Sequence, residues 1–280
     1  MKLWTKVVFP RLEKPFLLGD RIMLLGSCFA DSIGAKMEAA GFRVCVNPFG
    51  TLYNPASLSS AVARLDADTL FGPADCVEMG AGAGRICSFE HHTSFARESG
   101  EAFLEHANAR LQEARAFWKD CNRVILTLGT SFIWCHGGKP VSNCLKRPAG
   151  EFTRSMLTAE ESSSLLQSII SAHPEKSFML TVSPIRHLGD GAHSNAVSKA
   201  RLLLAADACR EAAYFPAFEI LNDELRDYRF YADDLVHPSQ QAVDYIWERF
   251  LEGCTDPSEA EAISENEKAA RRKAHRRILE

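Results

Sequence analysis

Three short apolar runs in the chain share one feature, because each ends at a small residue that is followed by a polar loop. The runs are Arg21–Leu25 before Gly26-Ser27-Cys28, Arg123–Leu128 before Gly129-Thr130-Ser131, and Phe178–Val182 before Ser183-Pro184. Helical patterns separate them, and this alternation is typical of α/β proteins with a parallel sheet. Ligands of such sheets bind outside the carboxyl ends of the strands, so we expect the chemistry at these three ends.

The other elements fit the same fold class. Apolar residues at positions 29, 33 and 37 predict a helix that ends at Gly41, and Arg43–Val46 predicts a strand. Further helices are predicted from Ser57, as N-cap, to Leu65, and over about 101–119, 195–213 and 239–251, with a short strand near 214–218. We predict a three-layer α/β/α sandwich with a mostly parallel sheet. The strand around Met23 should be interior, since its run is apolar on both faces.

Length and composition limit the function classes. The 280 residues, 46% of them hydrophobic, suffice for one domain over 1–255, with 256–280 as a charged C-terminal helix or tail. A net charge of −4 argues against nucleic-acid or acidic-membrane partners. The start lacks the pattern of a signal peptide, and no run approaches the ~20 apolar residues of a membrane span. We therefore expect a cytoplasmic protein whose nine cysteines are reduced.

The first motif with chemical meaning is Gly26-Ser27-Cys28, between a strand and a helix. A nucleophile there gains from the helix N-terminus, which lowers a thiol pKa and offers free N–H groups to an oxyanion. Small residues also close many strand-to-helix turns without catalysis, and a cysteine is often simply buried. The motif alone leaves both interpretations open.

The second motif is Asp233-Asp234-Leu235-Val236-His237-Pro238. A carboxylate three residues before a histidine can bond one ring nitrogen and leave the other to accept a proton from Ser or Cys. Pro238 and Ser239 also fit an ordinary helix start. The motif alone is weak, but together with a nucleophile more than 200 residues upstream, in the order nucleophile, Asp234, His237, it becomes informative.

Ordered blocks over most of residues 5–250 extend these two motifs. They are LLGSCFADSIG, NPFGTLYNP, LTLGTSFIW, SNCLK, TVSPIRHLGDG, NAVSKA and DELRDYRFYADDLVHPS. With these blocks the chain resembles the GSCFA family, which is grouped with the SGNH/GDSL hydrolases. The resemblance implies a flavodoxin-like three-layer fold and acyl-ester chemistry.

The resemblance also implies roles for single residues. The superfamily motif G-D-S-x-x-D, laid without gaps on residues 26–31, puts its nucleophilic Ser on Cys28 and its final acid on Asp31. Ser27 then takes the place of the first Asp. Cys28 is the favoured nucleophile, because a thiol ionises more readily than a hydroxyl. If the turn is remodelled, Ser27 serves instead.

The oxyanion and substrate contacts follow from the same resemblance. Gly50 is the natural second amide donor, whereas the Asn-bearing G-x-N-D motif is replaced by Gly129-Thr130-Ser131. The remaining candidates for donors or for the cleft lining are Thr130, Ser131, Asn54, Asn143, His92 and His187, and Arg186, Asn195 and Lys199 can bind a polar or anionic group or pair with nearby acids. The loop carrying His187 also allows a merely backbone-bonded imidazole.

No cofactor or metal is expected. Adjacent strand residues point to opposite faces, so His91 and His92 should not bind one ion, and no Cys/His cluster has zinc spacing. Gly80–Gly84 predicts a flexible turn rather than a dinucleotide loop, since it follows no buried strand.

The sequence thus predicts an acyl-ester hydrolase or O-acyltransferase. The superfamily resemblance implies O-acetyl or other short O-acyl groups on a saccharide or similar small polar substrate. The alternative is a non-catalytic α/β binding protein that retains the cleft, and the oligomeric state stays open.

Overall fold

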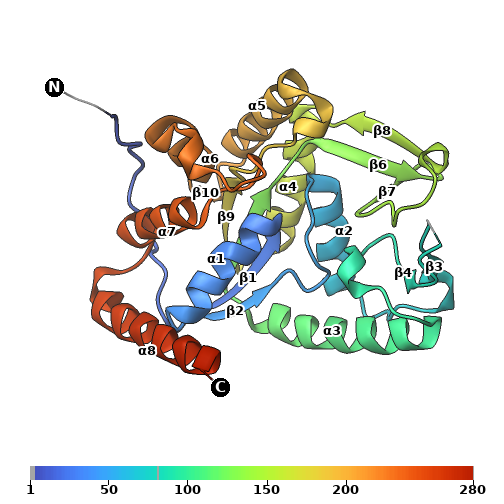
Figure 1. The fold of residues 1–280 in the computed structure, drawn as a ribbon, viewed down its shortest axis with the longest axis horizontal. Coiled ribbons are helices and arrows are strands. Elements are labelled where there is room, and N and C mark those ends of the chain that lie inside the picture. The colour runs from blue at the N-terminus through green and yellow to red at the C-terminus, as the bar shows by residue number, and fades with distance from the viewer. Residues whose placement is uncertain (1–3, 81, 280) are drawn as a thin grey trace.

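A five-stranded parallel sheet forms the centre of the molecule (Figure 1). The computed structural model describes residues 4–80 and 82–279. The strands are β1 (Arg21–Gly26), β2 (Arg43–Val46), β5 (Arg123–Leu128), β9 (Ser177–Val182) and β10 (Ala213–Tyr214), in the order β10-β9-β5-β1-β2. β1 lies between β5 and β2, which confirms the predicted interior position of the strand around Met23.

The two faces of β1 pack against different helices. Met23 and Leu25 belong to a core with α2 (Pro55–Asp66), α3 (Gly100–Asp120), α4 (Ala159–Ala172) and α5 (Ala192–Ala208). Ile22 and Leu24 belong to a second core with α1 (Cys28–Ala39), α7 (Gln240–Cys254) and the first half of α8 (Ala260–Leu279). Helices therefore cover both faces of the sheet, and the predicted three-layer α/β/α sandwich is confirmed.

The strand order fixes where a ligand can bind. From β1 the chain moves to β2 on one side, and it later returns to β5 on the other side. Such a reversal leaves a crevice at the carboxyl ends of the two inner strands. Those ends carry Gly26 and Leu128, so the fold directs attention to the loops that follow β1 and β5.

A second, smaller sheet was not predicted. β6 (Phe132–His136), β7 (Lys139–Val141) and β8 (Phe152–Met156) are antiparallel in the order β7-β6-β8. We call it the insertion sheet, and it projects from the core at the right of Figure 1. A short antiparallel pair, β3 (Val77–Glu78) and β4 (Ile86–Cys87), lies near it, and the predicted glycine-rich turn joins these two strands, with Ala81 outside the described residues.

Several element boundaries differ from the prediction. The helix expected from Ser57 begins at Pro55, because the Asn54 side chain caps it by accepting the Ser57 N–H at 2.9 Å. The strand expected near 214–218 is only β10, and α6 (Ala217–Glu219) and a π-helical turn (Ile220–Leu225) follow. Short 3-10 helices cover Pro73–Asp75, Thr93–Phe95, Ala149–Glu151, Leu188–Asp190, Tyr228–Phe230 and Pro257–Glu259.

The charged C-terminal segment is docked rather than free over its first half. Ile263 is buried, the Trp247 ring N–H donates to Glu267 at 2.7 Å, and the Asn266 amide donates to the Ala40 carbonyl at 3.0 Å. In the described part of the chain, none of the helices combines the length and the apolar character that crossing a membrane requires.

Candidate active site

The turn from β1 into α1 is held tightly from both sides. Gly26 comes so close to β5 that an added Cβ would lie 2.3 Å from the Thr127 carbonyl oxygen, so no larger residue fits. Ser27 is fully buried, and its hydroxyl caps α1 by accepting the Phe29 N–H at 3.4 Å. Cys28 is the first helical residue and is half-buried. The turn thus buries the Ser27 hydroxyl and leaves the Cys28 thiol accessible.

Asn47 braces this turn. Its side-chain oxygen accepts the Gly26 N–H at 2.8 Å, and its side-chain nitrogen donates to Asp31 at 2.7 Å. The backbone of Asn47 has a positive φ of 42°, which places its side chain under the turn. Asp31, the acid that the superfamily motif shares, therefore contacts the loop after β2. Burial raises the pKa of its carboxyl, and the Asn47 bond opposes that shift.

The helix N-terminus does not lower the thiol pKa overall. Burial raises the pKa of Cys28 above its ordinary value, and the nearby Asp31 charge raises it further. The N–H groups of Cys28 and Phe29 and the Lys199 charge act in the opposite direction without reversing the shift. The expected lowering of the thiol pKa by the helix N-terminus is therefore not found, because desolvation outweighs the helix end. A base must take the proton.

Asp234 and His237 form a pair in an exposed turn. The Nδ1 atom of His237 lies 2.6 Å from Asp234 Oδ2, and the other Asp234 oxygen accepts the backbone N–H groups of Val236 and His237, both at 2.9 Å. These bonds, the His237 N–H first, hold the pKa of Asp234 at about 2. With Nδ1–H directed at a carboxylate, Nε2 carries the lone pair that can accept a proton.

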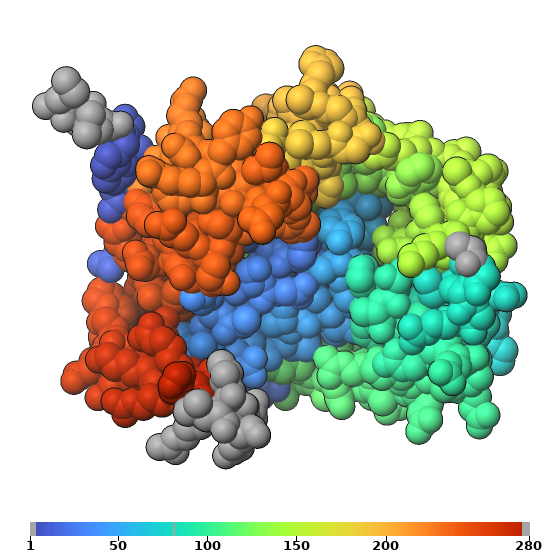
Figure 2. Space-filling view, in the orientation of Figure 1, coloured from blue at the N-terminus to red at the C-terminus, as the bar shows by residue number. Residues whose placement is uncertain are grey.

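One cavity of about 320 Å³ collects groups from several loops at the carboxyl edge of the sheet. Cys28 and His237 both line it, although no hydrogen bond joins them among the described residues. The other lining residues are Tyr53, Asn54, Thr130, Phe132, Trp134, Val141, Ser142, Arg154, Ile185, Arg186, His187, Asp190 and Val236. Figure 2 shows the blue surface of α1 and α2 between the orange segment that carries His237 and the yellow-green insertion sheet.

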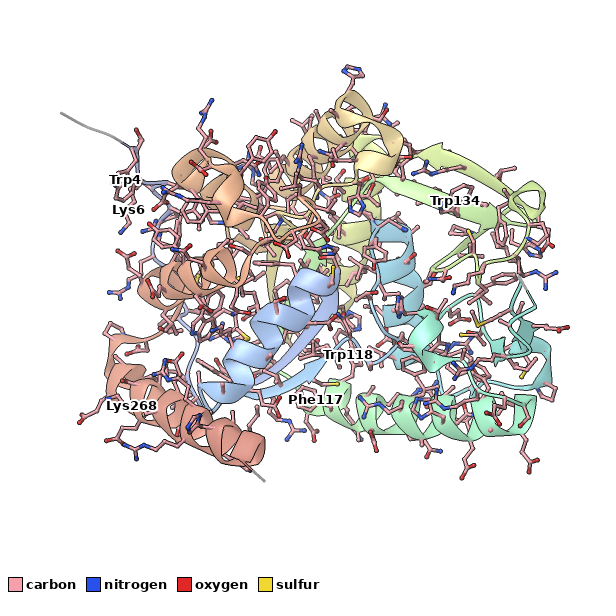
Figure 3. The ribbon with its side chains drawn as sticks, viewed as in Figure 1. Trp4, Lys6, Phe117, Trp118, Trp134 and Lys268 are labelled. Atoms are coloured by element: carbon pink, nitrogen blue, oxygen red, sulfur yellow. The ribbon has the colours of Figure 1, made fainter. Side chains whose placement is uncertain are left out.

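The insertion sheet forms one wall of the cavity. The Arg154 guanidinium lies over the rings of Phe132 and Trp134, at 4.2 and 4.9 Å from their centroids, and makes a two-pronged ion pair with Asp190. Trp134 lies on this sheet, away from the core (Figure 3). The pair ties β8 to the loop after β9, so the wall is fixed by a charge contact across 36 positions of sequence.

Two of the predicted oxyanion donors reach the cavity with a free hydrogen. Asn54 accepts the Ser57 N–H with its oxygen, so its amide nitrogen, which has no acceptor among the described residues, is left for a ligand. Ser198 accepts two hydrogens from Ser131 and therefore donates its own to Thr130. The hydroxyl hydrogen of Thr130 is then available to a bound group.

Three other predicted donors do not line the cavity. The Gly50 N–H donates to the Asn47 carbonyl at 2.8 Å within a tight turn, so it is not free. Ser131 is fully buried and bonds Ser198, and the Asn143 side chain accepts the Leu145 N–H at 2.8 Å within its own loop. Local partners thus satisfy the Gly50 N–H and the Ser131 hydroxyl, whereas Asn143 is set aside only because it lies outside the cavity lining.

The histidines separate by environment. His187 lines the cavity, its buried Nε2 has no partner in the described part of the chain, and burial lowers its pKa to about 4. His92 does not line it, because it packs on Gly50 and bonds Ser94 at 3.1 Å. His91 is buried among phenylalanine rings, and the two adjacent histidines lie after β4 rather than on a strand, contrary to the assumption behind the prediction. Within residues 4–80 and 82–279 no His, Cys, Asp and Glu cluster is arranged to hold a metal ion.

Sequence reasoning missed the residues of the insertion sheet and Tyr53. Tyr53 lies directly before Asn54, and its ring edge meets His187 at a centroid distance of 6.0 Å. Its place in the block NPFGTLYNP was the available signal. For Arg154 there was none, since its partner Asp190 is distant in sequence.

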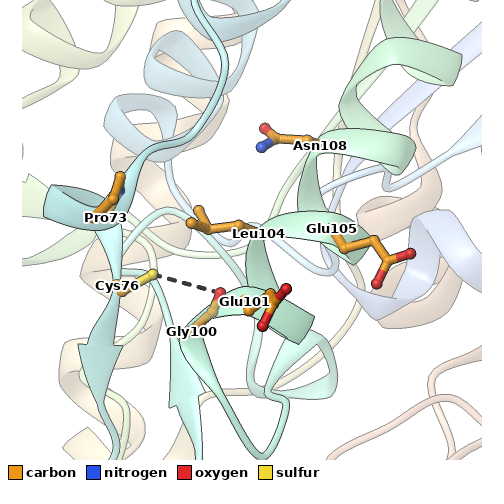
Figure 4. A pocket seen from close by; sticks show the side chains of 7 residues that line it. All are labelled: Pro73, Cys76, Gly100, Glu101, Leu104, Glu105 and Asn108. Carbon is orange, nitrogen blue, oxygen red and sulfur yellow. Dashed lines mark hydrogen bonds between the residues drawn. The ribbon is translucent and has the colours of Figure 1, made fainter.

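A separate hollow of about 620 Å³ lies between α3 and the Pro73–Asp75 helix (Figure 4). Its thiol, Cys76, lies 3.9 Å from the Gly100 carbonyl oxygen, and burial raises the Cys76 pKa. Leu104 and Asn108 complete one side, and no histidine lines the hollow. The hollow therefore lacks the combination of a thiol and a histidine base that lines the 320 Å³ cavity.

Comparisons with known proteins assign the chain to a family. No curated protein matches the sequence. Solved structures that resemble the chain include the esterase EstA from Pseudoalteromonas sp. (10% identity, 84% of this chain and 96% of that one, TM-score 0.39). A mutant of Axe2, an acetyl-xylooligosaccharide esterase from Geobacillus Stearmophilus, is another (11% identity, 84% and 94%, TM-score 0.44). The GSCFA family model matches residues 21–250, and the chain therefore belongs to the GSCFA family.

Proposed function

We propose that the protein is an acyl-ester enzyme, a hydrolase or an O-acyltransferase, with Cys28 as nucleophile, His237 as base and Asp234 as the group that orients His237. The observation that carries the proposal is the shared cavity: Cys28, at a helix N-terminus, and His237, whose Nδ1 is paired with Asp234, line the same 320 Å³ space. This is the nucleophile, base and orienting acid of covalent acyl transfer.

The reaction follows from these groups. His237 Nε2 takes the Cys28 thiol proton, and Sγ attacks the ester carbonyl carbon to form a C–S bond. The imidazolium then protonates the leaving alkoxide, which departs as an alcohol and leaves a thioester. Water or an acceptor alcohol, deprotonated by His237, attacks the thioester and releases the acyl product and the thiol. Asn54 and Thr130, with the Cys28 N–H, are the proposed donors to the oxyanion.

Support for Cys28 over Ser27 comes from the turn. The Ser27 hydroxyl is buried and caps the helix, and Ser27 is absent from the cavity lining, whereas Cys28 is part of it. The proposed substrate is a short O-acyl ester, such as O-acetyl, on a saccharide or similar polar molecule. The cavity lining favours polar substrates, because Arg154, Arg186 and Asp190 stand among its aromatic side chains.

A non-catalytic binding protein is the second candidate. Two observations favour it: the Gly50 N–H is already bonded, and Cys28 and His237 share no hydrogen bond among the described residues. In that case the cavity would bind an acyl compound without turning it over.

A trapping experiment separates the two. The protein is mixed with p-nitrophenyl acetate, and nitrophenol release and the mass of the intact chain are followed together. We expect turnover and, after rapid acid quench, one acetyl group on the peptide that contains Cys28. Cys28→Ala should abolish both, and Cys76→Ala, which removes a thiol outside the cavity, should change neither. Equal acetylation of Cys28→Ala and wild type would reject the proposed nucleophile.

A further inference from the structure

One face of the insertion sheet lines the candidate site. Phe132 and Trp134 are two positions apart on β6, and Val141 and Arg154 lie opposite Trp134 on the neighbouring strands. Side chains at such positions share one face of a sheet, and all four line the 320 Å³ cavity. On the other face, Ile133 packs in a small core with residues of α2 and of the loop before α4. The sheet is therefore anchored through one face and presents the other to the cavity.

The two ends of the cavity face differ in their cover. At the end next to the β6–β7 turn, Phe89 packs against the rings of His136 and Phe152, at centroid distances of 4.7 and 5.8 Å. At the other end, Phe132 and Trp134 stay partly exposed where they line the cavity. A ligand that enters the cavity can therefore lie against these two side chains.

The partly exposed end also has hydrogen-bond donors without acceptors. The ring N–H groups of Trp118 and Trp247 donate to carboxylates, whereas that of Trp134 has no acceptor among the described residues. Arg154 has five N–H groups, and Asp190 accepts two of them. Since a tryptophan N–H away from bulk water usually has a partner, a ligand with oxygen atoms at its edge would supply the missing acceptors.

These side chains select a particular ligand chemistry. The two aromatic rings favour an apolar surface, because contact with them removes that surface from water. The N–H groups of Trp134 and Arg154 favour hydroxyl or ether oxygens beside that surface. A sugar ring has both, with C–H groups on its face and oxygens at its edge. A hydrocarbon lacks the oxygens, and an anion fits less well, because Asp190 already neutralises Arg154.

This wall begins beside a proposed oxyanion donor. Thr130 is two positions before Phe132, and its hydroxyl oxygen accepts the Phe132 N–H at 3.1 Å. An ester carbonyl held by Cys28 and Thr130 is thus next to the wall, and one of its two substituents can reach it. The acyl chain of a short ester has no oxygen besides the carbonyl, whereas a sugar has several. The wall therefore fits the alcohol part of the ester.

We propose that Trp134 and Arg154, on the cavity face of the insertion sheet, bind the sugar ring that carries the acyl group. The ring lies against the aromatic side chains, and its oxygens accept hydrogen bonds from the Trp134 ring N–H and the Arg154 guanidinium. The ion pair with Asp190 holds that guanidinium in place. The inference rests on the proposed function, since it places the alcohol part of that reaction's substrate. It makes Trp134 and Arg154 determinants of specificity.

The test measures binding and needs no turnover. A methyl glucoside with one O-acetyl group is titrated into Cys28→Ala protein, and its dissociation constant is obtained from the NMR signal of the acetyl methyl group. Adding Trp134→Ala should raise the dissociation constant about tenfold. Adding Trp4→Ala instead, which removes an exposed tryptophan outside the cavity, should leave it unchanged. Equal dissociation constants in these two double variants, or no binding to Cys28→Ala protein, would overturn the proposal.

Cyclohexyl acetate tests the polar part of the wall, because it has a six-membered ring without hydroxyl groups. It should bind more weakly than the sugar ester. Arg154→Lys, which loses the planar guanidinium, should remove most of that difference, and this variant also serves if Trp134→Ala does not fold. Cyclohexyl acetate that binds as tightly as the sugar ester would overturn the proposal, and so would an Arg154→Lys protein that keeps the full difference.

Binding and turnover together separate this inference from the proposed function. Sugar-ester binding that depends on Trp134, in a protein whose wild type shows no turnover, would reject the proposed function and leave this inference standing. Acetylation of Cys28 by p-nitrophenyl acetate, without binding of the sugar ester, would reject this inference and leave the proposed function standing.

Discussion

The two halves of the candidate site are built in opposite ways. Cys28 follows a strand at the centre of the sheet, in a turn fixed by a buried serine and by Asn47 under Gly26. The Asp234 and His237 side chains are 50% and 48% exposed, and most hydrogen bonds of their turn lie within residues 230–239. From outside that range, Arg186 donates to the carbonyls of Leu235 and Val236.

This difference shows what each half depends on. The position of the thiol is set by the core, so it can change only if the sheet changes. The position of the histidine is set by a surface turn, whose opening costs much less than global unfolding. The separation between base and nucleophile can therefore shorten when substrate binds, and catalytic hydrogen bonds are often long before that point.

The largest expected effect tests the rigid half. Cys28→Ala should abolish turnover and leave circular dichroism and the urea midpoint close to wild type, since the thiol is only half-buried. Cys28→Ser should keep a fraction of the activity, and Ser27→Ala should retain most of it while losing a helix cap worth about 1 kcal/mol. An inactive Ser27→Ala beside an active Cys28→Ala would reverse the assignment.

Removal of the base should have the next largest effect. His237→Ala should lower kcat by roughly 10²–10⁴ with unfolding in urea unchanged. Asp234→Ala should lower kcat by a smaller factor and cause a modest loss of stability, because it also removes the acceptor of the Val236 and His237 N–H groups. The Asp234 pKa of about 2 means that its carboxylate stays charged at every pH above about 3, so it should not cause an acid limb in the pH–rate profile near pH 4–6. A large stability loss in either variant would contradict the surface-turn description.

Substitution of Asn47, in contrast, is expected to lower the stability of the fold. Asn47→Ala leaves the buried Gly26 N–H without an acceptor and should destabilise the fold by about 1–3 kcal/mol in urea unfolding. The control is Asp227→Ala, which removes an exposed side-chain bond to the Arg229 N–H and should cost under ~1 kcal/mol. Equal losses for the two would mean that the Cys28 turn is no more strongly braced than a loop.

A pH-dependent effect is expected from His187, the partly buried histidine of the cavity. Its folded pKa of about 4 lies below the ordinary 6.5, so between these values the unfolded chain binds a proton that the folded protein refuses. Stability should therefore fall as the pH drops from 6.5 towards 4, by up to about 1.4 kcal/mol per pH unit. His187→Phe should flatten this dependence, and His237→Ala should keep it.

Much of the core could be predicted because its signals are local. Apolar runs gave β1, β5 and β9, and helical periodicity gave most helices. The insertion sheet was not predicted, because no local apolar pattern marks its strands. They are stabilised by pairing with one another and by the ion pair between Arg154 and Asp190. Its one local sign was the Gly137-Gly138 turn between β6 and β7.

The candidate site, like the core, was predicted only in part. Motif spacing identified Cys28, Asp234 and His237, which lie in or beside one cavity. Gly50 was misassigned because its N–H closes a turn by donating to the Asn47 carbonyl. The thiol pKa was misjudged because burial is a property of the folded chain, and no spacing of residues reports it.

The insertion sheet has a consequence for how solvent and ligand enter. It leaves the core after Ser131 and returns at Leu157, whose N–H donates to the Ser131 carbonyl at 2.9 Å, so a single closed loop of chain carries one wall of the cavity. Such a loop can open as its own cooperative unit. In deuterium exchange, the amides of the insertion sheet should therefore exchange before those of β1 and β5. A ligand can then reach the Cys28 thiol when this segment opens locally, while the parallel sheet stays intact.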